Sequence, residues 1–304
     1  MLRAATFRRV GAATLLACAL SVSSAVAAQQ EKRVLLLTQN VFYNHDSLES
    51  IETVMPAWGR EAGFGVTSLL GYKQTAACSR ERHCDPGVAN LSMIDSKYLA
   101  QFDAIMMSTN GELPFTARGK QALVDFVRYG KGILFIHQAT VTLYSFRPWG
   151  EMLGAYAGRL SPLDVMNSTK RPVVLKIEDK RHPATRGLPM HWTLDDEFPQ
   201  FAVKAWDPAT PNENLGPTDL PIPLAFSRDH VKVVLSVDSE RTDFSGAPPG
   251  WEKNGDYPVA WYQYFGKGRT FYTSLGHRPD LWTADPIFKA HVVGALRWVL
   301  RLEN

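Results

Sequence analysis

Three histidines and one glutamate could carry out chemistry together if the fold brings them to one place. They are His45, His137, Glu197 and His277. Histidine titrates near neutral pH and ligates metals, and a carboxylate can be its acid–base partner or a further ligand. We expect His137 and His277 to be acid–base residues or metal ligands, Glu197 to be their carboxylate partner, and His45 to be a second-rank member. Zinc is the first candidate ion.

A structural role is the alternative for each of these residues. His137 directly follows the apolar run Ile133–Ile136, where a polar ring without a function would be out of place. His45 stands just before a predicted helix and could simply pack at its start, with Asp46 or Ser47 as the cap.

Neighbouring polar residues are expected to be structural. Asp195 and Asp196 are predicted to be turn or capping residues, which leaves Glu197 as the better carboxylate candidate. His182 precedes a proline, which favours a turn, and His191 is also expected to be structural.

Alternating strands and helices must position these side chains. Five apolar runs are predicted to be strands: Val34–Thr38, Val66–Leu70, Phe102–Ser108, Ile133–Ile136 and Thr270–Leu275. Helical patterns are found at Ser47–Ala62, Phe115–Tyr129, Trp149–Ala157 and Pro286–Leu302. This order predicts a doubly wound, mostly parallel α/β sheet with helices on both faces. Loops that follow parallel strands meet at one sheet edge, where this class of fold binds its ligands.

Three further strands are predicted to extend the sheet, some of them antiparallel. They are Val173–Glu178, Val231–Val237 and Val259–Tyr264. The Gly266-Lys267-Gly268 sequence is predicted to form a hairpin turn before the last strand. We expect residues 29–304 to form a single domain.

Residues 1–28 are predicted to be a signal peptide. Three arginines are followed by an apolar stretch, residues 10–22, and by the A-x-A cleavage signal Ala25–Ala27. The apolar stretch is too short to span a membrane. We expect export to the periplasm or the medium, with a lipid anchor on Cys18 as the less favoured alternative.

The charge balance becomes neutral once this leader is removed. The chain has 33 Lys and Arg against 30 Asp and Glu, and residues 1–27 hold three arginines and no acid, which leaves 30 against 30. A neutral chain without a basic stripe argues against nucleic acid as a partner. It suits a small neutral ligand such as a sugar or glycoside. The oligomeric state is left open.

Two cysteines remain in the mature chain, Cys78 and Cys84. In an oxidising compartment a disulfide between them is the leading interpretation. A metal pair with His83 is the alternative.

Five further residues are predicted to bind substrate. Asn110 and Gln138 follow predicted strands, so their amides could hydrogen-bond a ligand in the crevice. Tyr144, Trp261 and Trp282 could offer flat faces to sugar rings, with core packing as the alternative. The sequence lacks G-x-S-x-G, H-E-x-x-H, a phosphate-binding loop and a G-x-G-x-x-G after the first strand, which argues against serine hydrolases, nucleotide hydrolases and nicotinamide dehydrogenases.

Several stretches together resemble the trehalose-utilisation (ThuA-like) family over nearly the whole mature chain. They are Val34–Ser47, Leu123–Thr140, His182–Pro189, Leu194–Phe198 and Pro258–His277, of which the last is the most specific. The resemblance implies a flavodoxin-like sheet, similar to that of class I glutamine amidotransferases. It also implies a role in sugar catabolism, typically with disaccharides or their oxidised 3-keto forms.

The amidotransferase nucleophile is a cysteine on the elbow after a central strand, where this chain has His137. Glutaminase activity is therefore not expected. We expect an exported hydrolase or isomerase that acts on a glycoside or keto-sugar by acid–base or metal-assisted chemistry. A non-catalytic sugar-binding protein is the alternative, and a scaffold for protein interaction is a third.

Overall fold

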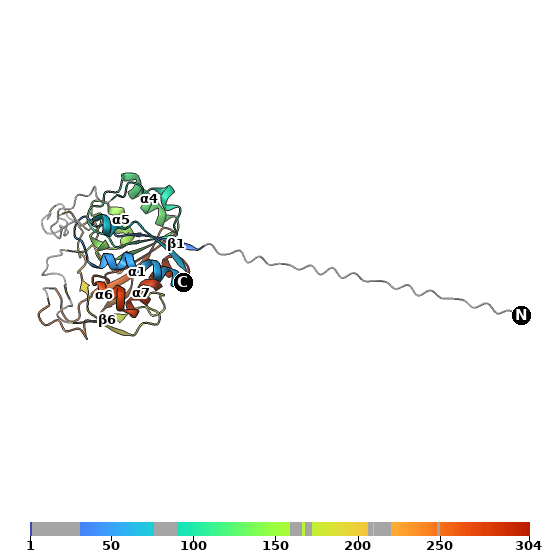
Figure 1. Ribbon diagram of the computed structural model, residues 1–304. Helices are drawn as coiled ribbons and strands as arrows, with labels where there is room; N and C mark the ends of the chain where they lie inside the picture. Colours follow the sequence, from blue (N-terminus) through green and yellow to red (C-terminus); the bar gives the residue numbers. More distant parts are fainter. Residues whose placement is uncertain are drawn as a thin grey trace. The chain divides into compact units, whose positions relative to one another are not determined.

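A nine-stranded mixed sheet forms the centre of the fold in the computed structural model (Figure 1). The structure describes residues 31–75, 90–158, 172–205, 220–247 and 250–304, together with Met1, Ala209 and the strand backbone at 166–167. Residues Glu31–Asn304 belong to one compact unit. The predicted signal peptide and the pair Cys78 and Cys84 with His83 lie outside the described residues.

Five parallel strands make up one half of the sheet. In spatial order they are β2 (Phe64–Ser68), β1 (Lys32–Leu37), β3 (Ala104–Met107), β4 (Gly132–Ile136) and β11 (Gly268–Thr273). Every residue of β3 and β4 is buried, as expected for strands covered on both faces. The order of these strands along the chain, second, first, third, fourth and fifth, is that of flavodoxin-like sheets.

The other half of the sheet is antiparallel. It continues from β11 through β10 (Pro258–Phe265), β9 (Lys232–Val237), β6 (Val173–Ile177) and β7 (His191–Leu194). Four pairs of neighbouring strands are thus parallel and four antiparallel. The sheet is therefore mixed rather than mostly parallel, although some antiparallel strands were expected in this half. For β10 and β11 the reason is their connection, which is too short for the crossover helix that a parallel pair needs. Gly266, at φ +61°, makes this turn, and the predicted hairpin is confirmed.

Helices cover both faces of the sheet, as predicted. One face carries α1 (Ser47–Ala62), α6 (Pro279–Ala284) and α7 (Pro286–Val299), and the other carries α3 (Ser96–Leu99), α4 (Ala117–Arg128) and α5 (Arg147–Leu153) (Figure 1). Alternate residues of β1 enter two separate cores, Val34 and Leu36 on the α1 side and Leu35 and Leu37 on the α4 side. This alternation follows from the two-residue period of a strand.

Two helices and two strands complete the described elements. They are α2 (Gly71–Thr75), the 3₁₀ helix η2 (His137–Val141) and the antiparallel pair β5 (Met166–Asn167) and β8 (Glu197–Phe198), while α6 had no counterpart among the predicted helices. Helix α1 has the predicted bounds. Helix α5 ends before the predicted Ala157 because Gly154 takes a left-handed φ of +99°.

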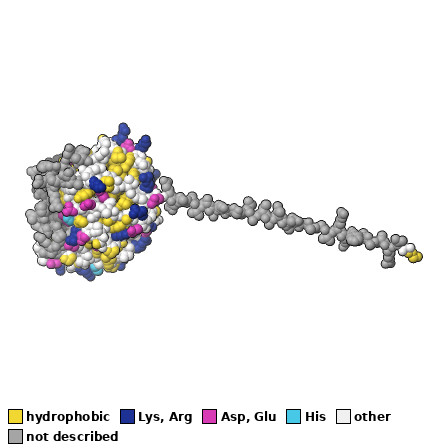
Figure 2. Space-filling view, viewed as in Figure 1, with side chains coloured by type: hydrophobic (Ala, Val, Ile, Leu, Met, Phe, Trp, Pro, Cys, Tyr) yellow, Lys and Arg dark blue, Asp and Glu magenta, His cyan; other side chains and the backbone are white. Residues whose placement is uncertain are grey.

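The described surface carries charges of both signs. Figure 2 shows basic and acidic side chains interspersed on the face in view. Among the described residues, no helix is both long enough and apolar enough to cross a bilayer.

Candidate active site: a histidine–glutamate cluster

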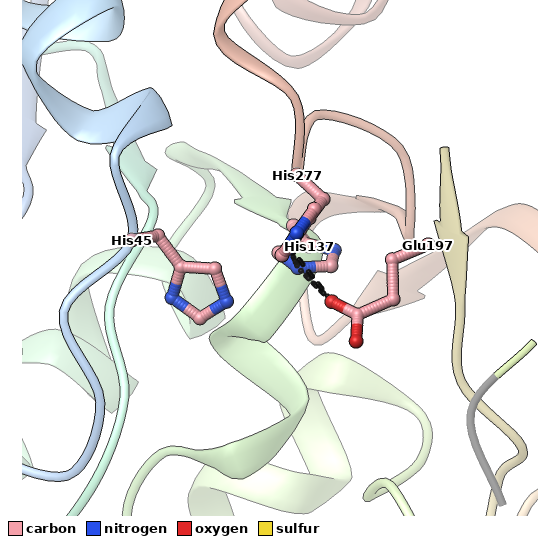
Figure 3. Close-up of side chains that lie close together, drawn as sticks. All are labelled: His45, His137, Glu197 and His277. Atoms are coloured by element: carbon pink, nitrogen blue, oxygen red, sulfur yellow. Dashed lines mark hydrogen bonds and ion pairs between the residues drawn. The ribbon is translucent and has the colours of Figure 1, made fainter. Parts of the chain in front are cut away.

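His45, His137, Glu197 and His277 meet at the carboxyl ends of the parallel strands (Figure 3). His45 comes from the loop between β1 and α1, His137 follows β4, His277 follows β11, and Glu197 lies in β8. One potential ligand atom from each of the four lies within 4.8 Å of the others. The rings of His45 and His137 are buried, and the side chains of Glu197 and His277 are partly buried. The convergence expected from the sequence is therefore found.

Three of the ligand atoms form a tight triangle. Oε2 of Glu197 lies 2.7 Å from His277 Nδ1 and 3.4 Å from His137 Nε2, and the two nitrogens are 3.2 Å apart. Ligands about 2.0–2.1 Å from a tetrahedral zinc ion are about 3.3–3.4 Å from one another. Two sides of the triangle have about this length, and the short third side is a hydrogen bond between the imidazole and the carboxylate.

His137 occupies an elbow directly after β4. Its φ of +46° lies in the left-handed region, which is uncommon for a residue with a side chain and is found at functional sites. The ring nitrogen Nδ1 donates to the carbonyl oxygen of Ser274 at 2.7 Å, and the hydroxyl of Tyr272 donates to the His137 carbonyl at 3.0 Å. Because Nδ1 donates to this carbonyl, Nε2 is the ring nitrogen that faces the cluster, as in metal-binding histidines that are oriented by a hydrogen-bond acceptor behind the ring.

His45 is held at the edge of the cluster by its own loop. Its ring centroid lies 5.0 Å from that of His137 and 5.3 Å from that of His277, both in edge-on contact. Its Nδ1 is buried and has no hydrogen-bond partner in the part of the chain that the structure describes. One of its ring nitrogens lies within 4.8 Å of the ligand atoms of the other three residues, which fits a fourth ligand or a substrate contact.

Asn110 fixes this loop. Its Oδ1 accepts from the backbone N–H groups of Phe42 (3.1 Å) and Tyr43 (3.2 Å), and its Nδ2 donates to the Tyr43 carbonyl at 2.5 Å. The side chain is 1% exposed. Because its amide is already engaged, Asn110 holds the His45 loop in place, which favours a positioning role over the predicted contact with substrate.

The charges of the cluster depend on one another. Burial would raise the pKa of Glu197, but hydrogen bonds to His137 and His277 outweigh it and hold the pKa far below its usual range. Burial would lower the pKa of His277, but its hydrogen bond to Glu197 raises it above its usual value. Burial, and then the neighbouring histidines, lower the pKa of His45 well below its ordinary value. The site thus offers a carboxylate, an imidazole, His277, whose pKa this carboxylate raises, and an imidazole, His45, whose protonation burial opposes.

The aromatic residues predicted to bind sugar rings lie in the core. Trp261, Trp282 and Tyr144 are 0–2% exposed. Each also uses its polar atom: Trp261 donates to Leu153 O, Trp282 to Gly276 O and Tyr144 to Ala157 O. A stacking platform needs an open face, so their burial argues against the predicted role.

Gln138 stands next to His137 and keeps one polar atom unused. Its Nε2 donates to Ser108 Oγ at 3.1 Å, whereas Oε1 is buried without a hydrogen-bond partner among the described residues. It is the one predicted substrate-binding residue with a polar group still available beside the cluster.

Sequence reasoning missed the residues that orient the cluster. Tyr272 and Ser274 hold His137, and Asp196 accepts hydrogen bonds from the backbone around His277. No spacing signal marks Tyr272 or Ser274, but the position of Asp196 beside Glu197 could have pointed to it. His182 and His191, expected to be structural, are not members of the cluster.

A surface hollow of about 550 Å³ is lined by residues outside the cluster, including Glu178, Arg228 and Tyr262. Arg228 pairs there with Glu178 (2.8 Å) and with Asp256. Because these charges satisfy one another, the chemistry of the histidine–glutamate cluster, and not the size of a hollow, identifies the candidate site.

The sheet, its two helical layers and the cluster define an α/β protein with a largely buried histidine–glutamate site at the carboxyl ends of its parallel strands. The model of the ThuA family, described as trehalose utilisation, matches residues 33–215 and 223–299. The chain belongs to the ThuA family.

Solved structures with the same fold share little sequence with this chain. A ThuA-like protein from Bacteroides uniformis is 17% identical, with a TM-score of 0.58 and coverage of 89% of this chain and 93% of the other. A ThuA-like protein from Parabacteroides merdae is also 17% identical, with a TM-score of 0.56 and coverage of 90% of this chain and 91% of the other. A cytoplasmic protein from Salmonella typhimurium LT2 is 11% identical, with a TM-score of 0.51 and coverage of 88% of this chain and 99% of the other. Among the curated proteins compared, none matches this chain.

Proposed function

We propose that the histidine–glutamate cluster is the active centre of a sugar-processing enzyme, and that His137, His277 and Glu197 bind a divalent ion there, with His45 as a fourth ligand. Zinc is the first candidate. The observation that carries the proposal is the approach of four ligand-type side chains to within 4.8 Å at the ligand-binding edge of the sheet.

The donor set suits such an ion. Two imidazoles and a carboxylate in a triangle of 2.7–3.4 Å need only small movements to surround zinc. The bond from His137 Nδ1 to Ser274 O already fixes the tautomer that a ligand needs. A bound divalent ion would act as a Lewis acid toward a substrate oxygen.

In the alternative without a bound ion, the same side chains would transfer protons directly. His277 holds a proton on Nδ1, shared with Glu197 at 2.7 Å, and could donate it to a leaving oxygen. His45, kept neutral by burial, could accept a proton from a hydroxyl group. These roles suit hydrolysis or isomerisation of a neutral glycoside or keto-sugar, in keeping with the family description.

The scaffold supports a relation to class I glutamine amidotransferases without their activity. The five parallel strands have the flavodoxin-like order, and an elbow follows the central strand β4. The elbow residue is His137 rather than a cysteine, so we expect no glutaminase activity.

We further propose that the protein is exported after cleavage near Ala27 and that Cys78 and Cys84 form a disulfide. The A-x-A signal Ala25–Ala27 supports export. Mass spectrometry of the protein from the periplasm or the medium tests both points. A chain that retains residues 1–27, or free thiols at both cysteines, would contradict them.

The metal content of the purified mature protein tests the proposed site. We expect close to one zinc or other divalent ion per chain, lost in His137→Ala and in His277→Ala. The matched control is His191→Ala, since His191 is an exposed histidine paired with Asp238 outside the cluster. A metal-free wild type that also resists reconstitution would refute the metal.

A screen of disaccharides and 3-keto-sugars tests the sugar-processing proposal. Turnover that is lost in His137→Ala supports an enzyme. Saturable binding without turnover would instead favour the alternative of a non-catalytic sugar-binding protein.

A further inference from the structure

Three consecutive carboxylates lie against the loop that carries His277, and only the last belongs to the cluster. Glu197 contacts the His277 ring. Asp195 binds the Arg278 guanidinium at 2.5 Å. Asp196, between them, is 1% exposed and turns its carboxylate to the backbone of the loop.

Asp196 binds the chain on both sides of His277. Its Oδ2 accepts from the Gly276 N–H at 2.7 Å, and its Oδ1 accepts from the Arg278 N–H at 3.3 Å. These N–H groups belong to the residues directly before and after His277. One buried side chain therefore fixes the backbone that sets where the imidazole points.

The loop needs such a fixed shape. Gly276 has a φ of +109°, and a Cβ at this position would lie 3.0 Å from the Trp282 ring. Its carbonyl accepts from Trp282 Nε1 at 3.0 Å. The peptide groups at Gly276 are thus held through the N–H by Asp196 and through the C=O by Trp282.

The sequence predicts that Asp196 is a turn or capping residue, but its hydrogen bonds differ from those of an ordinary turn residue. The 2.7 Å bond reaches a residue 80 positions further along the chain. Asp196 therefore ties the segment that carries Glu197 to the segment that carries His277. Because Asp196 and Glu197 are neighbours, the tie also sets the distance between the Glu197 carboxylate and the His277 ring.

We infer that Asp196 is a positioning residue of the site: by accepting the N–H groups of Gly276 and Arg278, it directs His277 Nδ1 at Glu197 and at the proposed metal. The inference deepens the proposed function and rests on it for the metal. Residues that orient metal ligands in this way change metal affinity about 10–100-fold when they are removed.

Zinc affinity measured by calorimetry tests this role in three variants. Asp196→Ala removes both acceptors, and Asp196→Asn keeps the shape but turns an NH₂ group toward one of the two N–H donors. Asp195→Asn is the matched control, because it removes the same charge one residue earlier and leaves the bonds to the backbone in place. We expect binding about 10–100-fold weaker in both Asp196 variants and close to wild type in the control.

Crystal structures of the metal-free variants give a second readout, independent of the metal. The contact of 2.7 Å between His277 Nδ1 and Glu197 Oε2 should be lost in Asp196→Ala and kept in Asp195→Asn. If Asp196→Ala fails to fold, the near-isosteric Asp196→Asn decides. Unchanged zinc affinity in the Asp196 variants, or an unchanged contact, would overturn the inference. A wild type that binds no zinc would refute the proposed metal, and the crystal structures would still decide the role of Asp196.

Discussion

Two groups of buried histidines in this protein differ in what their ring nitrogens meet. In the cluster, nitrogens of His137 and His277 face each other and Glu197. Elsewhere, His291 donates from Nδ1 to the Ala184 carbonyl at 2.9 Å and accepts at Nε2 from the Thr273 hydroxyl at 3.1 Å. Both ring nitrogens of His291 therefore have hydrogen-bond partners within the fold.

His182 belongs to this second, structural group, and only one of its two ring nitrogens has a hydrogen-bond partner among the described residues. Its Nδ1 accepts from the Ala184 N–H at 3.1 Å, and its ring stacks on Tyr262 and Phe271 with centroids 4.8 and 5.2 Å apart. Burial lowers the pKa to about 3 for His182 and about 4 for His291. Burial of a histidine is therefore common to both groups, and the carboxylate within reach of several rings is what distinguishes the site.

The largest expected difference between the groups is in metal binding. Glu197→Gln removes the charge that two histidines share, and we expect zinc affinity to fall about 100-fold or more, which is about 3 kcal/mol. His182→Gln, made in the structural group, should leave zinc affinity unchanged while lowering the free energy of unfolding. Calorimetric titration and urea unfolding of both variants measure this, and zinc binding that depends on His182 would break the comparison.

The next effect concerns pH and belongs to the structural group. Because the pKa of His291 is about 4 in the folded protein and its ordinary value is 6.5, the unfolded chain takes up the proton first as the pH falls. The stability from this residue is thus complete above pH 6.5 and is lost as the pH falls toward 4. Between pH 7 and pH 5 the loss is about 2 kcal/mol.

His291→Gln isolates this contribution, since the glutamine does not titrate. The difference in unfolding free energy between wild type and His291→Gln should narrow by about 2 kcal/mol from pH 7 to pH 5. Urea unfolding at the two pH values measures it. A difference that stays constant would show that His291 is protonated equally in both states.

The smallest expected effect is a several-fold difference in zinc affinity between variants of two buried tryptophans, each of which donates its indole N–H to a backbone carbonyl. Trp282→Phe removes the N–H donated to Gly276 O, in the loop of His277, and Trp261→Phe removes the one donated to Leu153 O. Each should lower the unfolding free energy by about 1–3 kcal/mol, because a buried carbonyl loses its partner. Zinc affinity should fall several-fold in Trp282→Phe alone. Equal zinc affinities in the two variants would remove Trp282 from the support of the site.

The sequence predicted much of the fold because burial leaves a clear pattern. Apolar runs such as Ile133–Ile136 mark strands covered on both faces, and the bounds of Ser47–Ala62 followed from its helical period. The antiparallel half was underestimated because pairing direction depends on connections, and the short strands β7 and β8 carry too few residues for a pattern.

The cluster itself was predictable and its surroundings were not. His137 and His277 stand at strand ends, where topology alone brings them together. Exposure is set by tertiary packing, so nothing in the sequence showed that Trp261 and Trp282 are core residues. The role of Asp196 depends on a contact with a segment 80 positions away, which a local pattern does not reveal.

The spread of the cluster along the chain has a consequence for how the protein folds. His137 and His277 are 140 positions apart and meet only when β4 pairs with β11, a strand from the end of the chain. Contacts between such distant segments form slowly and late. A ligand held by the cluster therefore cannot act as a nucleus for folding. It should instead slow unfolding of the whole chain, because every route to the denatured state must first separate the two strands that hold it.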